Sequence, residues 1–496
     1  MRQNGIVLFT LLCMVVSCAP AGPNYQRKDP SMPSRFGSLE KGITSSETVG
    51  GEFLSSWWIL LVDPVLNSLM DRALHGNQDI RIAQARVKQA RAMSLIGSAR
   101  YYPEGGFSGG YQRVSRSESV SSGQTSAGSG SGTAAATGNR QNNLFLIGFD
   151  ASWEIDIFGG IRREVEAAEA DLEASEDFLR DTLVTLQGEV ARNYIECRAY
   201  QLRLEIAHQE VKIRRENVDI TDARARAGFV SELDSARARG ELAGAESRIP
   251  FLENSLLVAL HRLGVLLGLE PMRLVNELHL PARLPEVPKN LPAGLPSDLL
   301  RRRPDIRRAE REIAAATARI GVSTAELFPK FSLTGAFGFQ ANSLNKLFRD
   351  KSNFWDIGPT INWSILNFKR ILATIEFSKA VHEETLARYE KTVLLSLEEV
   401  ENSLVRLTQE KRRIEALTEA VRSNDLAVQL AMERYLAGLQ SYLAVTDAEA
   451  ALFTAQDELV QSQQDHILGF VSLYKALGGG WLETYGTEGS ISNKAP

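Results

Sequence analysis

Cys18 is the residue of this 496-residue sequence whose surroundings most clearly specify a chemical modification. Arg2 precedes an apolar run over residues 6–16, which is the arrangement of an export signal. The run ends in Val15-Val16-Ser17-Cys18, which resembles a lipoprotein cleavage box. We therefore expect residues 1–17 to be removed as a signal peptide and Cys18 to carry a covalent lipid. An ordinary cleaved signal with a chance cysteine is the alternative.

The other reactive side chains form no catalytic or metal-binding pattern. The sequence has no phosphate loop, paired metal-ligand spacing or nucleophile elbow, and its six histidines are scattered. Cys13 lies in the signal, so Cys197 is left beside Cys18 and we expect it to be a buried bystander. The net charge of −5 is too balanced for a nucleic-acid surface. We expect no enzyme, no metal, no cofactor besides the lipid, and no nucleic-acid partner.

Four short segments alternate apolar with small or polar residues, which is the period of a β-strand. They are residues 105–112, 144–153, 331–340 and 356–364. In the third, Phe331, Leu333 and Phe337 face one way and Ser332 and Thr334 the other. Apolar outside and polar inside is the pattern of a membrane barrel with a wet lumen. A half-buried sheet in a soluble protein alternates in the same way, so the pattern alone does not decide.

Two segments are free of helix breakers over unusual lengths. Residues 161–226 contain no proline and one glycine, and residues 371–437 contain neither. At 1.5 Å per residue each helix would be about 100 Å long. Two apolar series are spaced by four and three residues, the pattern of a coiled-coil seam. They are Leu179, Leu183, Leu186 and Val190, and Val393, Leu397, Val400, Leu404 and Leu407.

Each long segment ends at a similar turn, Gly228-Phe229-Val230-Ser231 in the first and Gly438-Leu439-Gln440-Ser441 in the second. Glycine just past a helix end adopts the left-handed cap conformation cheaply, and serine three residues later can cap the next helix. The turns therefore predict two antiparallel hairpins, which return over residues 233–267 and 443–477. Pro250 should kink or divide the first returning helix.

The chain carries its own pattern twice. Seven residues of the first half recur 210 positions later: Trp153, Phe158, Gly228, Ser231, Leu233, Leu263 and Gly268. Upstream, Asp79-Ile80 and Pro103 recur 226 positions later. The first copy is thus 16 residues longer, in a Ser/Gly/Thr-rich loop over 115–143. We divide the chain into the signal (1–17), an N-terminal segment that begins the helical region (18–78), repeat 1 (79–268), a linker (269–304), repeat 2 (305–482) and a flexible tail (483–496).

Four strands cannot enclose a barrel, and lipid does not tolerate open sheet edges. If the strands span a membrane, subunits must pool them in a symmetric ring. Three copies, the number that the resemblance described below implies, would supply twelve strands. No stretch after residue 18 has 18 consecutive apolar residues, so we expect no transmembrane helix. Ala19 after the lipid cysteine favours sorting to an outer membrane.

Several motifs resemble those of the TolC-type outer-membrane efflux proteins, in particular the lipoprotein branch that pairs with resistance-nodulation-division pumps. They are Gly22-Pro23-Asn24-Tyr25, Trp57-Trp58 with Asp63-Pro64, the block from Gly294 to Ile306, and the block from Leu473 to Trp481. The resemblance covers residues 18 to about 482. It implies an α+β membrane protein, a trimer whose α-helical coiled-coil barrel continues a twelve-stranded outer-membrane β-barrel and reaches into the periplasm.

The resemblance also implies a role and its residues. The protein would be a passive outlet for drugs or other small molecules, driven by an inner-membrane pump through a periplasmic adaptor. The adaptor would grip the two turns, and Leu443 and Asp447, which share a helix face, match the family's periplasmic gate. Arg224, Arg226, Asp234 and Tyr435 would clamp the closed tip.

We expect a structural role for Arg301-Arg302-Arg303, paired with Asp298 and neighbouring acids. Two other functions stay open. One is a type I protein-secretion outlet, and the other is a lipid-anchored periplasmic coiled-coil scaffold that does not conduct.

Overall fold

The computed structural model describes the chain over residues 20–27, 30–38, 43–44, 55–115, 141–288, 291–292 and 296–481. The predicted signal peptide, Cys18 and the tail from 483 lie outside these residues. Two compact units are formed. The strand unit comprises Met1–Gln26, Ala90–Leu172 and Glu312–Thr385, and the hairpin unit comprises Arg27–Gln89, Glu173–Arg311 and Leu386–Pro496. Each unit therefore takes segments from both halves of the sequence.

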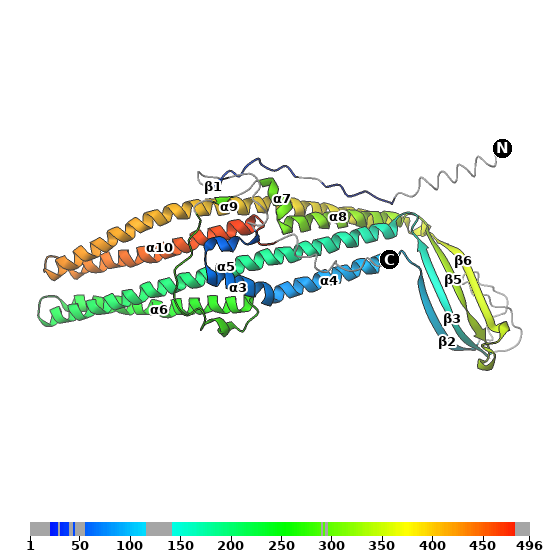
Figure 1. The fold of residues 1–496 in the computed structure, drawn as a ribbon, viewed down its shortest axis with the longest axis horizontal. Coiled ribbons are helices and arrows are strands. Elements are labelled where there is room, and N and C mark those ends of the chain that lie inside the picture. The colour runs from blue at the N-terminus through cyan, green and yellow to red at the C-terminus, as the bar shows by residue number, and fades with distance from the viewer. Residues whose placement is uncertain are drawn as a thin grey trace. The chain divides into compact units, whose positions relative to one another are not determined.

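The α-helices and sheet strands of the two halves follow the same order (Figure 1). In the first half they are α4 (Gln78–Ala99), β2 (Glu104–Ser115), β3 (Gln141–Ile155), α5 (Gly160–Arg226) and α6 (Glu232–Leu266). In the second half they are α8 (Pro304–Ala325), β5 (Lys330–Ala341), β6 (Asn353–Asn362), α9 (Phe368–Leu436) and α10 (Tyr442–Ala476). Before α4 lie β1 (Ile43–Thr44), η1 (Trp57–Leu61) and α3 (Pro64–Gly76). Between the halves lie η2 (Pro271–Leu274), β4 (Leu291–Pro292), η3 (Pro296–Asp298) and α7 (Leu299–Arg302).

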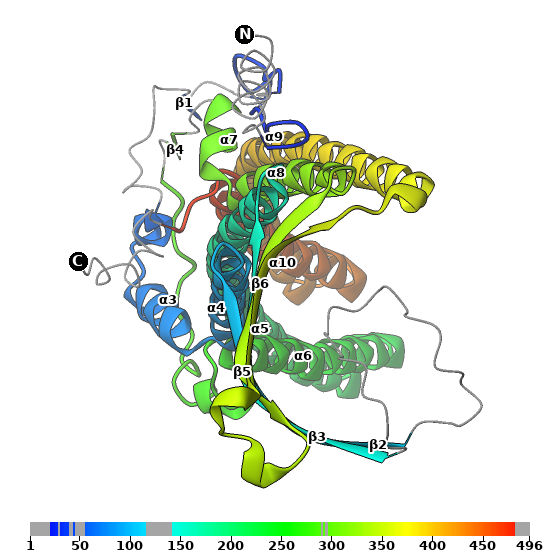
Figure 2. The same ribbon diagram turned by 90° about the vertical axis from the view of Figure 1, so that its right-hand side faces the viewer.

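The strand unit holds one antiparallel sheet in the order β2-β3-β5-β6 (Figure 2). The register places four aromatic residues in one row across it: Phe107, Phe149, Phe337 and Trp355. All four are more than half exposed. The next row carries Gly106, Asp150, Ala336 and Asp356, on the opposite face because successive side chains alternate. The predicted alternation is confirmed, with strand ends shifted by one to three residues.

The two halves also repeat single hydrogen bonds. The indole Nε1 of Trp153 donates to the carbonyl of Tyr101, and that of Trp363 donates to the carbonyl of Leu327, both at 3.0 Å. Trp153 lies within β3, whereas Trp363 lies just beyond the end of β6 at Asn362, not within a strand as predicted. Its indole ties the end of the strand to the turn that follows α8.

The hairpin unit contains the predicted coiled-coil seams. Val393, Val400, Leu404 and Leu407 are buried on α9, as are Leu183, Leu186 and Val190 on α5. The other two predicted seam residues, Leu179 and Leu397, are only partly buried. Pro250 does not divide α6, which runs unbroken from Glu232 to Leu266. Pro250 is exposed, so the backbone carbonyl that loses its partner to the proline ring can bind water instead.

By length and composition alone, α6 passes the test for a membrane-crossing helix, with an 18-residue window of mean hydropathy 1.3. The sequence did not predict α6 as a transmembrane helix, because it contains no run of 18 consecutive apolar residues. One such helix is weak evidence, because core helices pass the same test. Charged residues along α6 pair with α5: Arg239 with Asp222 at 2.8 Å, and Arg248 with Glu210 at 3.0 Å.

Polar anchors hold the loops around the middle of the hairpin unit. Asp63 caps α3 by accepting from the amides of Val65 and Leu66, and its other oxygen accepts from the Tyr194 hydroxyl at 2.6 Å. Of the three arginines predicted to be structural, Arg303 pairs with Asp305 at 2.7 Å and with Glu399 at 2.6 Å. The predicted partner Asp298 is not among the described partners of Arg303. A short parallel pairing of β1 with β4 was not predicted.

Cys197 is buried, as expected, and burial raises the pKa of its thiol to about 11. A thiol with so high a pKa is unreactive at neutral pH.

Candidate gate and docking tips

Both hairpins turn on the same backbone motif. Gly228 and Gly438 have φ of 77° and 73°, in the left-handed region. The amide after each glycine donates to a carbonyl five residues back, Phe229 to Arg224 and Leu439 to Arg434, each at 2.9 Å. These are Schellman caps, which satisfy the last carbonyls of the long helix. A Cβ at either glycine would meet nothing within 4 Å, so φ alone demands glycine here.

The turn residues beyond the glycines are exposed. Phe229 and Leu439, which are 210 positions apart, are 76% and 72% exposed. Val230, Gln440 and both serines are also half-exposed or fully exposed. Each hairpin therefore presents one large apolar side chain at its end, as a docking surface requires.

The first turns of α10 separate an inner from an outer face. Tyr442 and Val445 are buried with Ala238 and Tyr435 in a small core that joins the two hairpins. Leu443, at 45% exposure, and Asp447 lie on the opposite face. Within the described residues, no ion pair or hydrogen bond occupies the Asp447 carboxylate. The two predicted gate residues thus share a face that is free within one chain, and their gate role stays a prediction.

Arg224 links the ends of the two long helices. Its Nη1 donates to the carbonyl of Leu436 at 3.1 Å, and its guanidinium lies 4.9 Å from the centre of the Tyr435 ring. Burial raises the pKa of the Tyr435 hydroxyl, and the nearby Arg224 cation partly opposes this. Two of the four predicted clamp residues therefore touch.

The other two predicted clamp residues are placed differently. Arg226 donates to the carbonyl of Asp222, one turn back on its own helix. Asp234 lies in the first turn of α6, and among the described residues its carboxylate forms no ion pair or hydrogen bond. The carboxylate at the tip that is held by side chains is Asp222, which accepts from Ser235 and pairs with Arg239 at 2.8 Å. These hydrogen bonds, from Ser235 first and then Arg239, lower the pKa of Asp222. Asp222, Ser235 and Arg239 were not predicted from the sequence.

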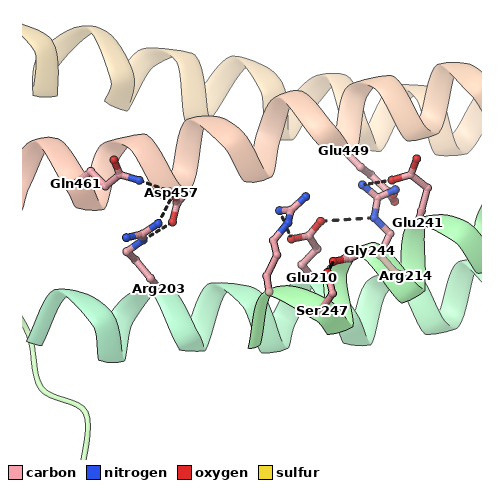
Figure 3. A network of polar contacts seen from close by, with 10 residues as sticks. Arg203, Glu210, Arg214, Glu241, Gly244, Ser247, Glu449, Asp457 and Gln461 are labelled. Atoms are coloured by element: carbon pink, nitrogen blue, oxygen red, sulfur yellow. Dashed lines mark hydrogen bonds and ion pairs between the residues drawn. The ribbon is translucent and has the colours of Figure 1, made fainter. Parts of the chain in front are cut away.

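Further from the tips, buried charges connect α5 to α10 (Figure 3). The Arg214 side chain is 2% exposed, and its Nη1 lies 3.1 Å from Oε2 of Glu449, which is 1% exposed. Oε1 of Glu449 accepts from the Asn217 amide at 2.7 Å. Glu210 and Glu241 approach the same guanidinium at 3.7 and 3.6 Å.

Burial raises the pKa of both Glu210 and Glu449, although the cations Arg248 and Arg214 oppose the shift. A second link is bidentate, from Arg203 on α5 to Asp457 on α10 at 2.6 and 3.0 Å (Figure 3). These links between α5 and α10 were not predicted from the sequence either. The burial of Glu449 could have been predicted from the sequence, because Glu449 lies at seam spacing between the apolar residues Val445 and Leu452.

The fold and these tips define a class of protein: a channel subunit with long helical hairpins and a four-stranded membrane sheet. The family model described as "Outer membrane efflux protein" matches residues 69–269 and 295–479. The chain therefore belongs to the outer membrane efflux protein family. It is a passive channel of the outer membrane that extends into the periplasm.

Individual relatives agree over nearly the full length. The solvent efflux pump outer membrane protein SrpC of Pseudomonas putida is 33% identical, with 97% of this chain and 99% of that protein covered. Nodulation protein T of Rhizobium leguminosarum bv. trifolii is 29% identical, with 94% and 96% covered. The solved structure of the outer-membrane channel OprN superposes with a TM-score of 0.83 at 33% identity, covering 93% of this chain and 99% of that one.

Proposed function

We propose that three copies of this chain pool their strands into a closed twelve-stranded barrel. The observation that carries this is the sheet itself. Strands β2 and β6 each have a neighbour on one side only, and the sheet has one aromatic face and one face with acids and glycines. Backbone groups at open edges cannot stay unpaired in lipid, so the edges pair with those of other copies. The native mass of the detergent-solubilised assembly tests this: we expect a trimer, and a monomer that remains folded would contradict it.

The cargo consists of drugs or other small molecules. Relatives carry names of solvent and toluene efflux and of pyoverdine export, which supports small amphiphilic cargo. Energy would come from an inner-membrane pump of the resistance-nodulation-division class through a periplasmic adaptor. The exposed Phe229 and Leu439 at the two tips support the adaptor contact, because a large apolar side chain on a tight turn is a suitable anchor.

Leu443 and Asp447 close the periplasmic end. Brought to a threefold axis, three leucines would plug the path, and three carboxylates would repel one another or bind a cation. Replacing both by alanine should therefore open the channel. We expect a conductance in planar bilayers several times that of the wild type, and cells newly sensitive to large antibiotics.

The duplication supplies a matched control for the gate variant. The positions 210 residues earlier are Leu233 and Arg237, which are also exposed, near the start of α6. Alanine at both should leave conductance unchanged. Equal conductance of the Leu443→Ala/Asp447→Ala trimer and the wild type would remove the gate assignment.

Cys18 carries the lipid. The support comes from the segment that follows it, which docks on the start of α5, next to the end of β3. The amide of Ala21 donates to the carbonyl of Phe158 at 2.9 Å, and Arg163 donates to the Ala21 carbonyl at 3.0 Å and to Asn24 at 2.6 Å. Cys18 is only two residues before Pro20, a span of at most about 7 Å. An acyl group there is within reach of the membrane surface.

Cys18→Ala should abolish labelling of the protein with radioactive palmitate while the trimer still forms. Cys197→Ala is the control, since that thiol is buried and should not take label. Label that persists in the Cys18→Ala protein would overturn the lipid assignment.

A further inference from the structure

The connection between β5 and β6, residues 342–352, is a compact cationic surface, here called the β5–β6 loop. It contains Lys346, Arg349 and Lys351 against one acid, Asp350, in a chain whose overall charge is −5. All three cations are exposed. Within the part of the chain that the structure describes, none of them forms an ion pair or a side-chain hydrogen bond. The loop therefore offers free positive charge for a ligand.

The backbone of the loop is held in shape. Two 3₁₀ turns, η4 (Leu344–Lys346) and η5 (Asp350–Ser352), follow one another, and Leu347 between them is buried. The Ser352 hydroxyl donates to the carbonyl of Lys346 at 2.7 Å, and the Ser352 amide donates to the carbonyl of Arg349 at 2.8 Å. The cations are thus carried on a fixed framework, which lowers the entropy lost when they bind.

The loop continues the aromatic face of the sheet. Phe348 is 70% exposed, and its ring lies 5.7 Å from that of Phe339, which lies 6.1 Å from that of Phe337. Phe337 belongs to the aromatic row that crosses all four strands. Leu344, also in the loop, is 65% exposed. Apolar surface therefore runs along the sheet and into the loop, where the three cations begin.

The loop lies at the outer end of the strands. β5 begins just after α8 and runs away from it, so the connection to β6 is at the end opposite the helices. Because the helices extend into the periplasm, this end faces the cell exterior. Apolar surface capped by cations fits a ligand with several acyl chains and a phosphorylated head, so we propose that the β5–β6 loop binds the phosphates of an acylated lipid of the outer leaflet, of the lipid A type. This rests on the proposed barrel.

The test uses the full-length purified trimer and bis-phosphorylated hexa-acylated lipid A, with retained lipid counted by native mass spectrometry across a titration. The variant is Lys346→Gln/Arg349→Gln/Lys351→Gln. Each cation near an anionic surface contributes about 1 kcal/mol, so we expect affinity to fall on the order of a hundredfold. The matched control removes three exposed lysines from the helices, Lys88→Gln/Lys212→Gln/Lys391→Gln, and should retain wild-type affinity.

Two further ligands show whether the acyl chains alone or the phosphates alone account for binding. Lipid A without phosphates keeps the acyl chains, and inorganic phosphate keeps only the anion; both should bind far more weakly than the intact lipid. Equal retention by the loop variant and the wild type would overturn the inference, and so would inorganic phosphate that displaces the lipid at equal concentration. The mass and conductance of the same samples report on the trimer separately, so a conducting trimer with no lipid preference refutes this inference and leaves the channel intact.

Discussion

The two hairpins share a turn but differ in what their returning helices do. Both α6 and α10 are 35 residues long, yet 9 residues of α6 are buried against 17 of α10. α6 is held by ion pairs at its surface, such as Arg215 with Glu246 at 2.9 Å. α10 is held by an apolar face and by the buried Glu449. Duplication thus preserved the turn geometry while the two helices acquired different packing.

The difference is sharpest at one pair of equivalent positions. Glu449 on α10 is 1% exposed and contacts the buried Arg214. The position 210 residues earlier on α6 is Arg239, which is 64% exposed and pairs with Asp222. A buried charge without its partner is costly, whereas a surface pair contributes little. The position on α10 therefore holds a buried ionic contact, whereas the equivalent position on α6 holds an exposed one.

The largest predicted effect follows from that contrast. Glu449→Ala leaves Arg214 buried without its closest anion and should cost about 3–5 kcal/mol, while Arg239→Ala breaks only a surface pair and should change stability far less. The thermal midpoint of the helical circular dichroism signal measures both in the intact assembly. The double variant Arg214→Met/Glu449→Leu should recover most of the loss, because it removes both charges. Equal midpoints for Glu449→Ala and Arg239→Ala would refute the contrast.

A smaller effect distinguishes the two serines after the turns. Ser231 and Ser441 have the same extended backbone, but only Ser231 accepts a hydrogen bond, from the amide of Leu233 at 3.1 Å. Ser231→Ala should cost about 1 kcal/mol and Ser441→Ala only a few tenths, since no side-chain cap is lost there. Amide hydrogen exchange in the first turns of α6 and α10 measures each locally. If Ser441→Ala accelerates exchange in α10 more than Ser231→Ala accelerates exchange in α6, the assignment of the cap to Ser231 is wrong.

The same comparison shows what the sequence could and could not predict. The glycine–serine turns, most of the seam residues and the strand faces follow from local spacing and are present. The two-residue pairing of β1 with β4 has no period and could not be found that way. Glu449 is visible as a charge at a seam position. Its partner Arg214 is 235 residues away in sequence, and which cation lies opposite depends on helix packing that spacing does not specify.

The smallest predicted effect is on the pH dependence of stability. As pH falls, the contribution of Glu449 should increase and that of Asp222 should decrease. Burial raises the pKa of Glu449, so the folded state takes up its proton before the unfolded state does. Its contribution to stability is therefore full below the unfolded pKa near 4.5 and is lost as pH rises through the higher folded pKa. Hydrogen bonds lower the pKa of Asp222, so its contribution is present above 3.8 and is lost as pH falls below that value.

Thermal midpoints from pH 7 down to 3 separate these two contributions. Between pH 7 and 4.5, the curve of Glu449→Gln should diverge from that of the wild type, because glutamine cannot take up the proton that favours folding on acidification. Asp222→Asn should run parallel to the wild type in that range and diverge only below about pH 4, where the wild type alone loses the Asp222 contribution. Glu210 cancels in the Asp222→Asn comparison, whereas the Glu449→Gln curve also includes the coupling of Glu449 to Glu210, because both carboxylates lie near Arg214. A Glu449→Gln curve parallel to the wild type from pH 7 to 4.5 would show that the α10 carboxylate stays ionised, held by Arg214 more strongly than burial opposes it.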